Sequence, residues 1–285
     1  MIVSSKYICV LEELSRELMK SYRLKKIEPD DTGMQRFLGM NLHIIKNKNQ
    51  RTELIKVNQK EYIEQITSKE EVSNLARIQS PLPPGYYFDL DRNKNYFDHV
   101  KDIKKLKTSF KEEIGQLLYI AVMTRPDIAY SVNYLAQFCE TPHPETFDMI
   151  RRIRLFLYKT SDKSLEFQKV QGSRSVNLYT DSDYARGTVY WKSKYTSLVC
   201  TSSAQAELQA IFFSLNESIW FRQLIIYLGM AKKSKIVTLY VDNMSIINSI
   251  NNDGFSQLSK HYAVRLAAVK ERINLMMKIP LVNLD

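Results

Sequence analysis

The order of apolar and polar positions along the first third of the chain predicts short helices and a hairpin. Across residues 7–22, apolar residues recur at steps of three and four, which gives a helix with one apolar face. The apolar run 37–45 favours a strand, and the polar stretch 46–50 favours a turn. A second strand at 53–57 would complete the hairpin, and a helix is expected near 59–67.

The middle of the chain is predicted to be mostly helical. Three prolines and a glycine in the segment 81–85 interrupt regular structure, because proline removes donors and glycine frees the backbone. The polar, lysine-rich stretch 86–111 is interpreted as a connecting segment with a solvated face, and a stripe that tracks nucleic acid is the alternative. A helical region is expected at 112–138, with a second helix starting at Pro126, and another helix at 145–159.

The last third changes to an alternation of strands and helices. Strands are predicted at 164–169, 175–179, 187–195, 196–200 and 236–241, and helices at 203–229, 245–251 and 261–273. The predicted fold class is therefore mixed α and β, α/β in its last third and of the α+β type as a whole.

Composition indicates a globular chain with a preference for polyanions. With 44% apolar and 11% aromatic residues, 285 residues can fill one large core or two ordinary ones. Lys and Arg outnumber Asp and Glu by 41 to 31, and this excess favours nucleic acid because neutralising phosphates releases counterions. A net charge of +10 also serves solubility, so the charge alone leaves both interpretations open.

The few cysteines and histidines argue against disulfides and zinc. Cys9, Cys139 and Cys200 are odd in number and far apart, which is typical of a reduced, intracellular protein of the cytoplasm or nucleus. The four histidines form no spaced cluster with cysteine, so a zinc site is not expected. No signal peptide and no run of about 18 uncharged apolar residues is present, so no membrane association is expected.

Three acidic residues stand where carboxylates converge in α/β folds. Asp181 follows the apolar strand that ends at residue 180, Asp242 ends the strand 236–241, and Glu207 lies early in the helix that begins near 203. Such oxygen ligands suit Mg²⁺, and two ions about 4 Å apart can activate a water and stabilise a leaving oxygen in phosphodiester cleavage. The alternative is that the aspartates are turn residues and the glutamate complements the helix dipole. Asp183 competes with Asp181 because it lies on the same face of the strand.

Several motifs, taken in order, resemble the polymerase polyprotein of copia-type retrotransposons. The motifs similar to the family's RNase H domain are Tyr179-Thr-Asp-Ser-Asp-Tyr-Ala185, Trp191-Lys-Ser-Lys194, Ser202-Ser-Ala-Gln-Ala-Glu207, Trp220-Phe-Arg222 and Val241-Asp-Asn243. Those similar to its post-polymerase segment are Arg36-Phe-Leu-Gly-Met40, Pro81-Leu-Pro-Pro-Gly85, Ile114-Gly-Gln-Leu-Leu-Tyr119 and Thr124-Arg-Pro-Asp-Ile-Ala129. The likeness covers nearly the whole chain.

The resemblance implies a fold and a chemistry. Relatives copy element RNA into DNA and degrade the RNA strand of the RNA/DNA hybrid with magnesium. The implied organisation is a reverse transcriptase remnant of palm and thumb at 1–85, a helical connection at 86–170, and an incomplete RNase H-like mixed sheet with helices at 171–285. By matching position, Asp181, Glu207 and Asp242 resemble the first three RNase H carboxylates, which are catalytic and bind the metal, and no small-molecule substrate is implied.

The departures from the family pattern imply a truncated chain. Residues 1–5 resemble the stretch that follows the family's paired polymerase aspartates, so no DNA polymerisation is expected. Only five residues join Ala185 to Trp191, where relatives carry another strand, and Ala263 stands where relatives usually have an aspartate. The family's fourth carboxylate would lie beyond a last strand, and Asp285 is a poor substitute at a terminus. Because misplacement by about 1 Å can cost about two orders of magnitude in rate, slow or absent nuclease turnover is expected.

Three functional hypotheses follow. The first is a truncated retrotransposon fragment without robust catalysis. The second is an active magnesium-dependent ribonuclease on RNA/DNA hybrids, and the third is a host-retained protein that binds nucleic acid without cutting it.

Overall fold

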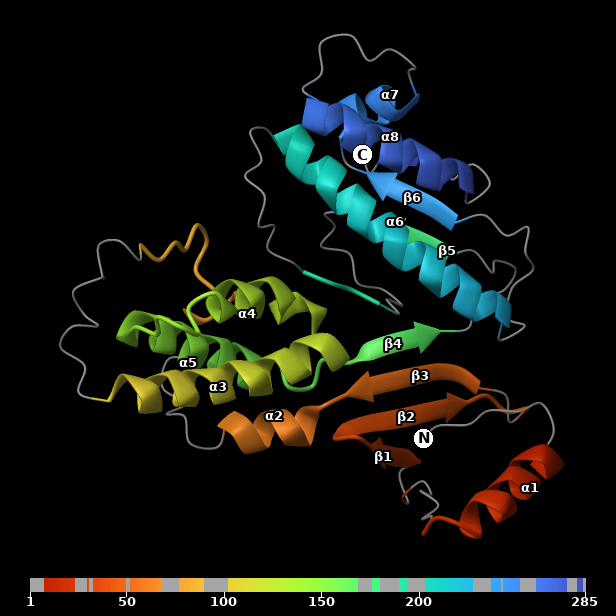
Figure 1. The fold of residues 1–285 in the computed structure, drawn as a ribbon. Coiled ribbons are helices and arrows are strands. Elements are labelled where there is room, and N and C mark those ends of the chain that lie inside the picture. The colour runs from red at the N-terminus through yellow and green to blue at the C-terminus, as the bar shows by residue number, and fades with distance from the viewer. Residues whose placement is uncertain are drawn as a thin grey trace. The chain divides into compact units, whose positions relative to one another are not determined.

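The computed structural model describes thirteen segments of the chain and divides the chain into two compact units (Figure 1). The described segments are residues 8–23, 30, 33–49, 52–67, 77–89, 102–168, 176–179, 190–193, 203–227, 237–241, 243–251, 260–275 and 281–283. Unit 1 comprises residues 1–169 and 186–192, and unit 2 comprises residues 170–185 and 193–285. The segments assigned by resemblance to a reverse transcriptase remnant and to a connection both fall within unit 1 up to residue 169, and their identity stays a prediction.

Unit 1 contains a four-stranded antiparallel sheet. Its strands pair in the order β1, β2, β3 and β4, with bounds Met34–Phe37, Met40–Lys46, Thr52–Asn58 and Leu165–Gln168. The strand β4 comes from a point more than a hundred residues after β3, yet Lys56 lies opposite Glu166 and forms a 2.7 Å ion pair with it. The fourth strand of this open sheet is therefore added by a pairing between segments far apart in the sequence.

The first hairpin of this sheet corrects a predicted element. The apolar run 37–45 was expected to be one strand, but it is cut by a two-residue turn between β1 and β2. Both turn residues have positive φ, 49° at Leu38 and 69° at Gly39, which is the backbone of a type I′ hairpin turn. The Tyr119 hydroxyl donates a hydrogen bond to the Leu38 carbonyl and holds the turn against the helix that carries Tyr119.

The helices of unit 1 follow the periodic pattern with one correction. They are α1 (Ile8–Met19), α2 (Lys60–Thr67), α3 (Ile103–Met123), the short 3₁₀ helix η3 (Pro126–Ile128), α4 (Ala129–Ala136) and α5 (Pro144–Lys159). The break before Pro126 is confirmed. The helix α3, however, begins within the stretch interpreted as a connecting segment, because the Asp102 side chain caps it by accepting a hydrogen bond from the Lys105 N–H at 3.0 Å.

The core of unit 1 is built from the helices α2, α3, α4 and α5. Phe110, Ile114 and Leu117 recur along α3 at steps of four and three, and all three are buried. They belong to the same cluster as Ile150 and Leu157 of α5. The N-terminus of α5 is capped, because His143 and Thr146 form a reciprocal capping box around its first turn.

Unit 2 combines a three-stranded parallel sheet with three helices. The strands β5 (Val176–Tyr179), β6 (Val237–Val241) and β7 (Leu281–Asn283) pair in that order, with β6 in the centre. The helices are α6 (Ser203–Tyr227), α7 (Met244–Asn251) and α8 (Lys260–Leu275). The helices α6 and α8 lie side by side (Figure 1) and are joined by Arg272, whose Nε donates to Asn216 at 2.6 Å and whose guanidinium lies 4.3 Å from the ring centre of Phe212.

The predicted strands 187–195 and 196–200 are not seen in the described part of the chain. Residues 190–193 of the predicted strand 187–195 are not in a strand, and the rest of that strand and the strand 196–200 lie outside the described residues. Among the helices that the structure describes, none is both long and apolar enough to cross a membrane.

Candidate functional site

The parallel pairing of β5 with β6 defines the candidate site. Val176 lies opposite Val237, and Tyr179 lies opposite Tyr240. The carboxyl ends of parallel strands meet at one edge of a sheet, and in open α/β sheets ligands bind at that edge. The edge of unit 2 that follows Tyr179 and Val241 is therefore where a site is expected.

Two of the three predicted ligands immediately follow these strand ends. Asp181 comes two residues after Tyr179, and Asp242 comes one residue after Val241. Both aspartates lie outside the described residues, as does the competing Asp183. The structure thus describes the strands that lead to the aspartates, whereas the position of their carboxylates stays a prediction.

The chain on the far side of Asp242 is well fixed. The Asn243 Oδ1 accepts hydrogen bonds from the Ser245 N–H at 2.9 Å and from the Ser245 hydroxyl at 2.8 Å, which caps the start of α7. Asp242 and the capping residue Asn243 are consequently the two residues between the end of the central strand β6 and the start of α7.

The third predicted ligand, Glu207, lies in the second turn of α6 and is half-buried. The next residue, Leu208, and Ile211 are fully buried in a cluster that also contains Leu239 and Val241 of β6. The buried face of α6 therefore packs in the same core as the strand that precedes Asp242. This packing is an observed link between the element of Glu207 and one of the two strand ends.

The chemistry of this residue set fits a hard divalent cation. Carboxylate oxygens are the ligands that Mg²⁺ prefers. Among the described residues, no three His, Cys, Asp or Glu side chains lie close enough together to hold a metal, and the candidate centre depends on the two aspartates that lie outside them. The match between this residue set and Mg²⁺ therefore depends on two things: the ligand atoms are carboxylate oxygens, and the register of β5 and β6 leads to both aspartates. Ala263, where an aspartate was expected by resemblance, is a half-buried residue of α8, and Asp285 is not described.

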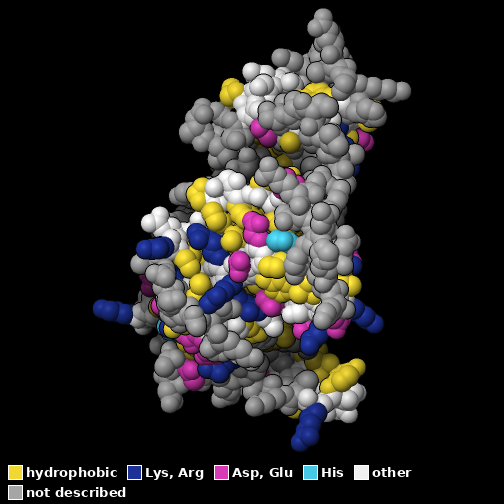
Figure 2. Space-filling view, turned by 90° about the vertical axis from the view of Figure 1, so that its left-hand side faces the viewer, with side chains coloured by type: hydrophobic (Ala, Val, Ile, Leu, Met, Phe, Trp, Pro, Cys, Tyr) yellow, Lys and Arg dark blue, Asp and Glu magenta, His cyan; other side chains and the backbone are white. Residues whose placement is uncertain are grey.

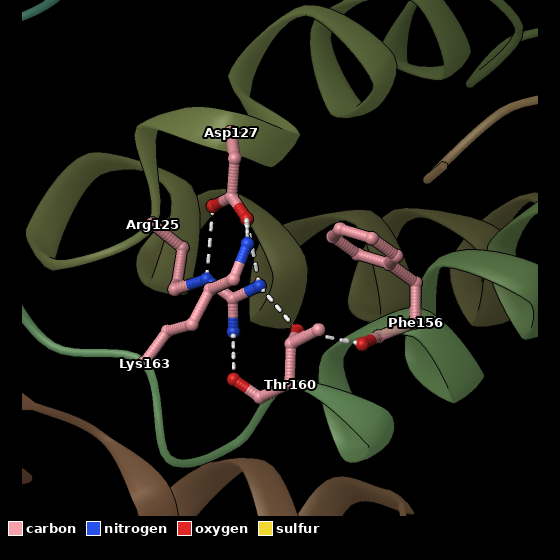
Figure 3. A network of polar contacts seen from close by, with 5 residues as sticks. All are labelled: Arg125, Asp127, Phe156, Thr160 and Lys163. Atoms are coloured by element: carbon pink, nitrogen blue, oxygen red, sulfur yellow. Dashed lines mark hydrogen bonds and ion pairs between the residues drawn. The ribbon is translucent and has the colours of Figure 1, made fainter. Parts of the chain in front are cut away.

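A second polar constellation, in unit 1, was quoted as a motif from the sequence but was assigned no role. The side chain of Arg125 is only 2% exposed, and its guanidinium lies between Asp127 and Thr160 (Figure 3). Its Nε and Nη2 donate to the two Asp127 carboxylate oxygens at 2.8 Å each, and its Nη1 donates to the Thr160 carbonyl at 3.0 Å. The guanidinium also faces the Phe156 ring at 5.7 Å. Each of the three guanidinium nitrogens donates at least one hydrogen bond, so this constellation ties η3 to the end of α5.

The charged side chains of the face drawn in Figure 2 are interspersed. Among the residues described there, Lys and Arg alternate with acidic and apolar side chains and form no continuous basic patch. Part of the positive charge is also neutralised locally, since Lys107 and Lys111 both pair with Glu140. On the face drawn in Figure 2, the positive charges of the described residues are thus spread among other side chains and do not form one basic surface.

Comparison with known proteins identifies distant relatives over most of the chain. It is 26% identical to the Retrovirus-related Pol polyprotein from transposon TNT 1-94 of Nicotiana tabacum, an alignment that covers 96% of this chain and 21% of that protein. It is 27% identical to the Truncated transposon Ty1-A Gag-Pol polyprotein of Saccharomyces cerevisiae, over 90% of this chain and 23% of that protein. The Putative transposon Ty5-1 protein YCL074W of the same yeast is 28% identical over 61% of this chain and 51% of its own length.

These matches show a distant relationship that extends over most of the chain. It is a distant homologue of copia/Ty1-type retrotransposon Pol polyproteins, and it spans about a fifth of the length of the tobacco relative. No family model matches the chain. No solved structure matches it either.

Proposed function

We propose that unit 2 of this distant Pol polyprotein homologue is an RNase H-like module that binds RNA/DNA hybrids and cleaves their RNA strand slowly. In this proposal Asp181, Glu207 and Asp242 hold Mg²⁺. The proposal concerns unit 2 alone.

The observation that carries the proposal is the register of β5 and β6. Tyr179 lies opposite Tyr240, so continuing the register by two residues would bring Asp181 opposite Asp242. Neighbouring strands are about 4.8 Å apart, and residues two apart along a strand point to the same face. Two carboxylates on one face at this separation repel each other unless a cation lies between them.

The packing of α6 supports a role for Glu207. Because Leu208 and Ile211 share a core with Val241, the first turns of α6 are held close to the central strand of the sheet. A third carboxylate on this helix suits the oxygen-rich coordination that Mg²⁺ requires.

The chemistry divides between the metal and the chain. Bound Mg²⁺ ions would activate a water and stabilise the leaving oxygen of the phosphodiester. Asp181 and Asp242 would bind the cation from the strand ends, and Glu207 would complete the set from the helix. The net charge of +10 would favour the polyanionic hybrid over neutral substrates.

Slow turnover is part of the proposal. By resemblance, relatives place another strand of the sheet between the positions of Ala185 and Trp191, whereas residues 186–192 of this chain belong to unit 1. A sheet without that strand would position Asp181 less rigidly, and small errors in position have large effects on rate.

The test is cleavage of a labelled RNA/DNA hybrid with Mg²⁺ by the full chain. Even second-shell partners of a metal ligand contribute about 10- to 100-fold, so Asp181→Asn and Asp242→Asn should each lower the rate by about 100-fold or more. Glu271→Gln, which changes an exposed carboxylate on α8, serves as the matched control and should leave the rate unchanged. Equal cleavage by the wild type and both aspartate variants would contradict the proposal.

The second candidate function is binding without cleavage, and the observation that favours it is the net charge of +10. In that case the hybrid binds with an affinity that falls steeply with salt, and none of the carboxylate substitutions weakens binding. Salt-dependent binding without Mg²⁺-dependent cleavage would select this function.

A further inference from the structure

One side of α6 carries aromatic side chains that lie outside the core of unit 2. Phe213, Trp220 and Tyr227 recur at steps of seven residues, and residues seven apart in a helix differ by only about 20° around its axis. We call these three residues the aromatic stripe. The buried residues Ile211 and Leu215 face the core from the opposite side of the helix. The helix α6 therefore has two apolar sides, and only one of them belongs to the core of unit 2.

The aromatic stripe is exposed, and its exposure rises along the helix. The exposed fraction is 37% at Phe213, 56% at Trp220 and 88% at Tyr227. Within the same helix the Phe213 ring meets the Phe212 ring at a centroid distance of 5.9 Å, which fixes the shallow end of the stripe. Contiguous aromatic surface of this kind marks an interaction site, because its exposure to water is unfavourable.

The charges of α6 decide which kind of partner fits the aromatic stripe. The helix contains one basic residue, Arg222, which is two positions from Trp220 and so lies on a different side. The exposed residues Asn216 and Gln223 border the stripe and are uncharged. Nucleic acid that stacks on aromatic rings also needs cations along its phosphates. The stripe therefore fits an apolar protein surface with a polar, uncharged rim.

We propose that the aromatic stripe is a dimer contact, on which the α6 helix of a second copy of this chain packs in the antiparallel direction. A stripe centred on Trp220 is self-complementary in such a pair, since Trp220 meets Trp220 and Phe213 meets Tyr227. This direction sets the least exposed ring against the most exposed one, so the helices stay evenly spaced. It also brings opposite ends of the two helix dipoles together. The inference goes beyond the proposed nuclease function and holds whether or not unit 2 cleaves RNA.

The size of the aromatic stripe predicts a weak dimer. A buried aromatic side chain covers about 150–250 Å², so the exposed parts of the three rings amount to about 350 Å² per copy and about 700 Å² per dimer. Stable complexes bury about 1,200–2,000 Å², and transient ones less. With its polar rim the contact falls into the transient class, for which we expect a Kd on the order of 10 μM.

Sedimentation of the full chain over a range of concentrations around this Kd tests the proposal. The wild type should change from monomer to dimer. Trp220→Glu places two like charges face to face, and Tyr227→Glu places a charge against Phe213, so each should weaken the dimer by about tenfold or more. Glutamate is a good helix former, so circular dichroism should show unchanged helix content. If Trp220→Glu does not fold, Tyr227→Glu at the end of α6 carries the test.

The matched control is an exposed tyrosine of unit 1. Tyr87 resembles Tyr227 in type and in exposure, so Tyr87→Glu changes the charge of the chain equally but leaves the aromatic stripe intact. It should form dimers as the wild type does. A wild type that stays monomeric throughout, or a dimer that neither α6 substitution weakens, would overturn the proposal.

Disulfide cross-linking tests the direction of the helices, in a chain whose three native cysteines are replaced by serine. Trp220→Cys should form a cross-linked dimer under oxidation, because residue 220 meets itself. Tyr227→Cys alone should not, since the two copies of residue 227 would be about 20 Å apart along the helix axis. A mixture of Phe213→Cys and Tyr227→Cys should cross-link. Efficient cross-linking of Tyr227→Cys to itself would contradict the antiparallel dimer.

Discussion

Arg125 and Asp127, two residues apart on either side of a proline, form a bidentate ion pair in which the arginine is buried and the aspartate is one-third exposed. The fork geometry suits a guanidinium and not an ammonium group. We expect Asp127→Asn to lower the free energy of unfolding of unit 1 by about 3 kcal/mol, because it leaves a buried charge without its counterion. Chemical denaturation followed by circular dichroism measures this loss.

Lys163 provides the control for this ion pair. Its Nζ lies 3.9 Å from the same Asp127 carboxylate, but its side chain is 61% exposed. Exposed pairs contribute about 1 kcal/mol or less, so Lys163→Met should change stability only slightly. A loss for Lys163→Met as large as that for Asp127→Asn would show that burial of Arg125 does not dominate the constellation.

The hairpin turn at Leu38 and Gly39 predicts opposite effects at adjacent residues. Leu38 has φ of 49° and is 64% exposed, and asparagine tolerates this backbone better than leucine. We expect Leu38→Asn to stabilise unit 1 by about 1 kcal/mol, because asparagine adopts the left-handed backbone at lower cost than leucine. Gly39→Ala should destabilise it by about 1 kcal/mol, since Gly39 also has positive φ.

The cost at Gly39 comes from the backbone and not from crowding. A methyl group there would meet the Tyr119 hydroxyl at 3.5 Å, which is an ordinary contact. Thermal unfolding of the two variants beside the wild type decides the matter. Shifts of the same sign in both would rule out the type I′ turn as their cause.

The same turn shows where sequence reasoning reaches its limit. The helices α5 and α6 lie close to the expected bounds 145–159 and 203–229, and the break at Pro126 was predictable because proline cannot continue a helix. The turn was missed because leucine is not a typical residue for positive φ. The start of α3 was missed because lysines dominate residues 101–111, although Asp102 is a capping residue and Phe110 already faces the core.

The candidate site was only partly predictable for a different reason. The strands before Asp181 and Asp242 were recognised from their apolar runs, and β5 and β6 are present close to the expected bounds. The two strands are neighbours and pair in parallel. This pairing joins segments far apart in the sequence, so the local pattern of apolar residues does not reveal it. The pairing of β3 with β4 and the hydrogen bond from the Trp191 indole to the Ala121 carbonyl were unpredictable on the same grounds.

Alkaline pH should destabilise unit 1 through Tyr86. Partial burial, and then the negative charge of Glu145, raise the pKa of the Tyr86 phenol well above its ordinary value of 10.0. The unfolded chain therefore ionises first, so the stabilisation is fully present below pH 10 and is lost as pH rises above it. Tyr86→Phe should flatten this alkaline loss in denaturation experiments between pH 8 and about 11.

The neighbouring Tyr87 supplies the matched control. It is 75% exposed, so Tyr87→Phe should keep the pH dependence of the wild type. If the alkaline loss is equally steep in Tyr86→Phe and in the wild type, other groups cause it.

Magnesium should stabilise unit 2 if the three carboxylates converge, and this test needs no catalysis. A cation that binds only the folded state adds RT ln(1 + [Mg²⁺]/Kd), about 2.7 kcal/mol at a concentration of about 100 Kd. Without metal the same carboxylates repel each other, so Asp181→Asn should raise stability in EDTA by about 1 kcal/mol. It should also abolish most of the gain from Mg²⁺, whereas Glu271→Gln on α8 should do neither.

The effect of Asp181→Asn on stability should thus be positive in EDTA and negative in Mg²⁺, as expected only for a carboxylate that shares a cation with its neighbours. Thermal unfolding of the three proteins in both buffers measures this, and a wild-type melting curve that Mg²⁺ does not move would show that the strand register fails to bring Asp181 and Asp242 together.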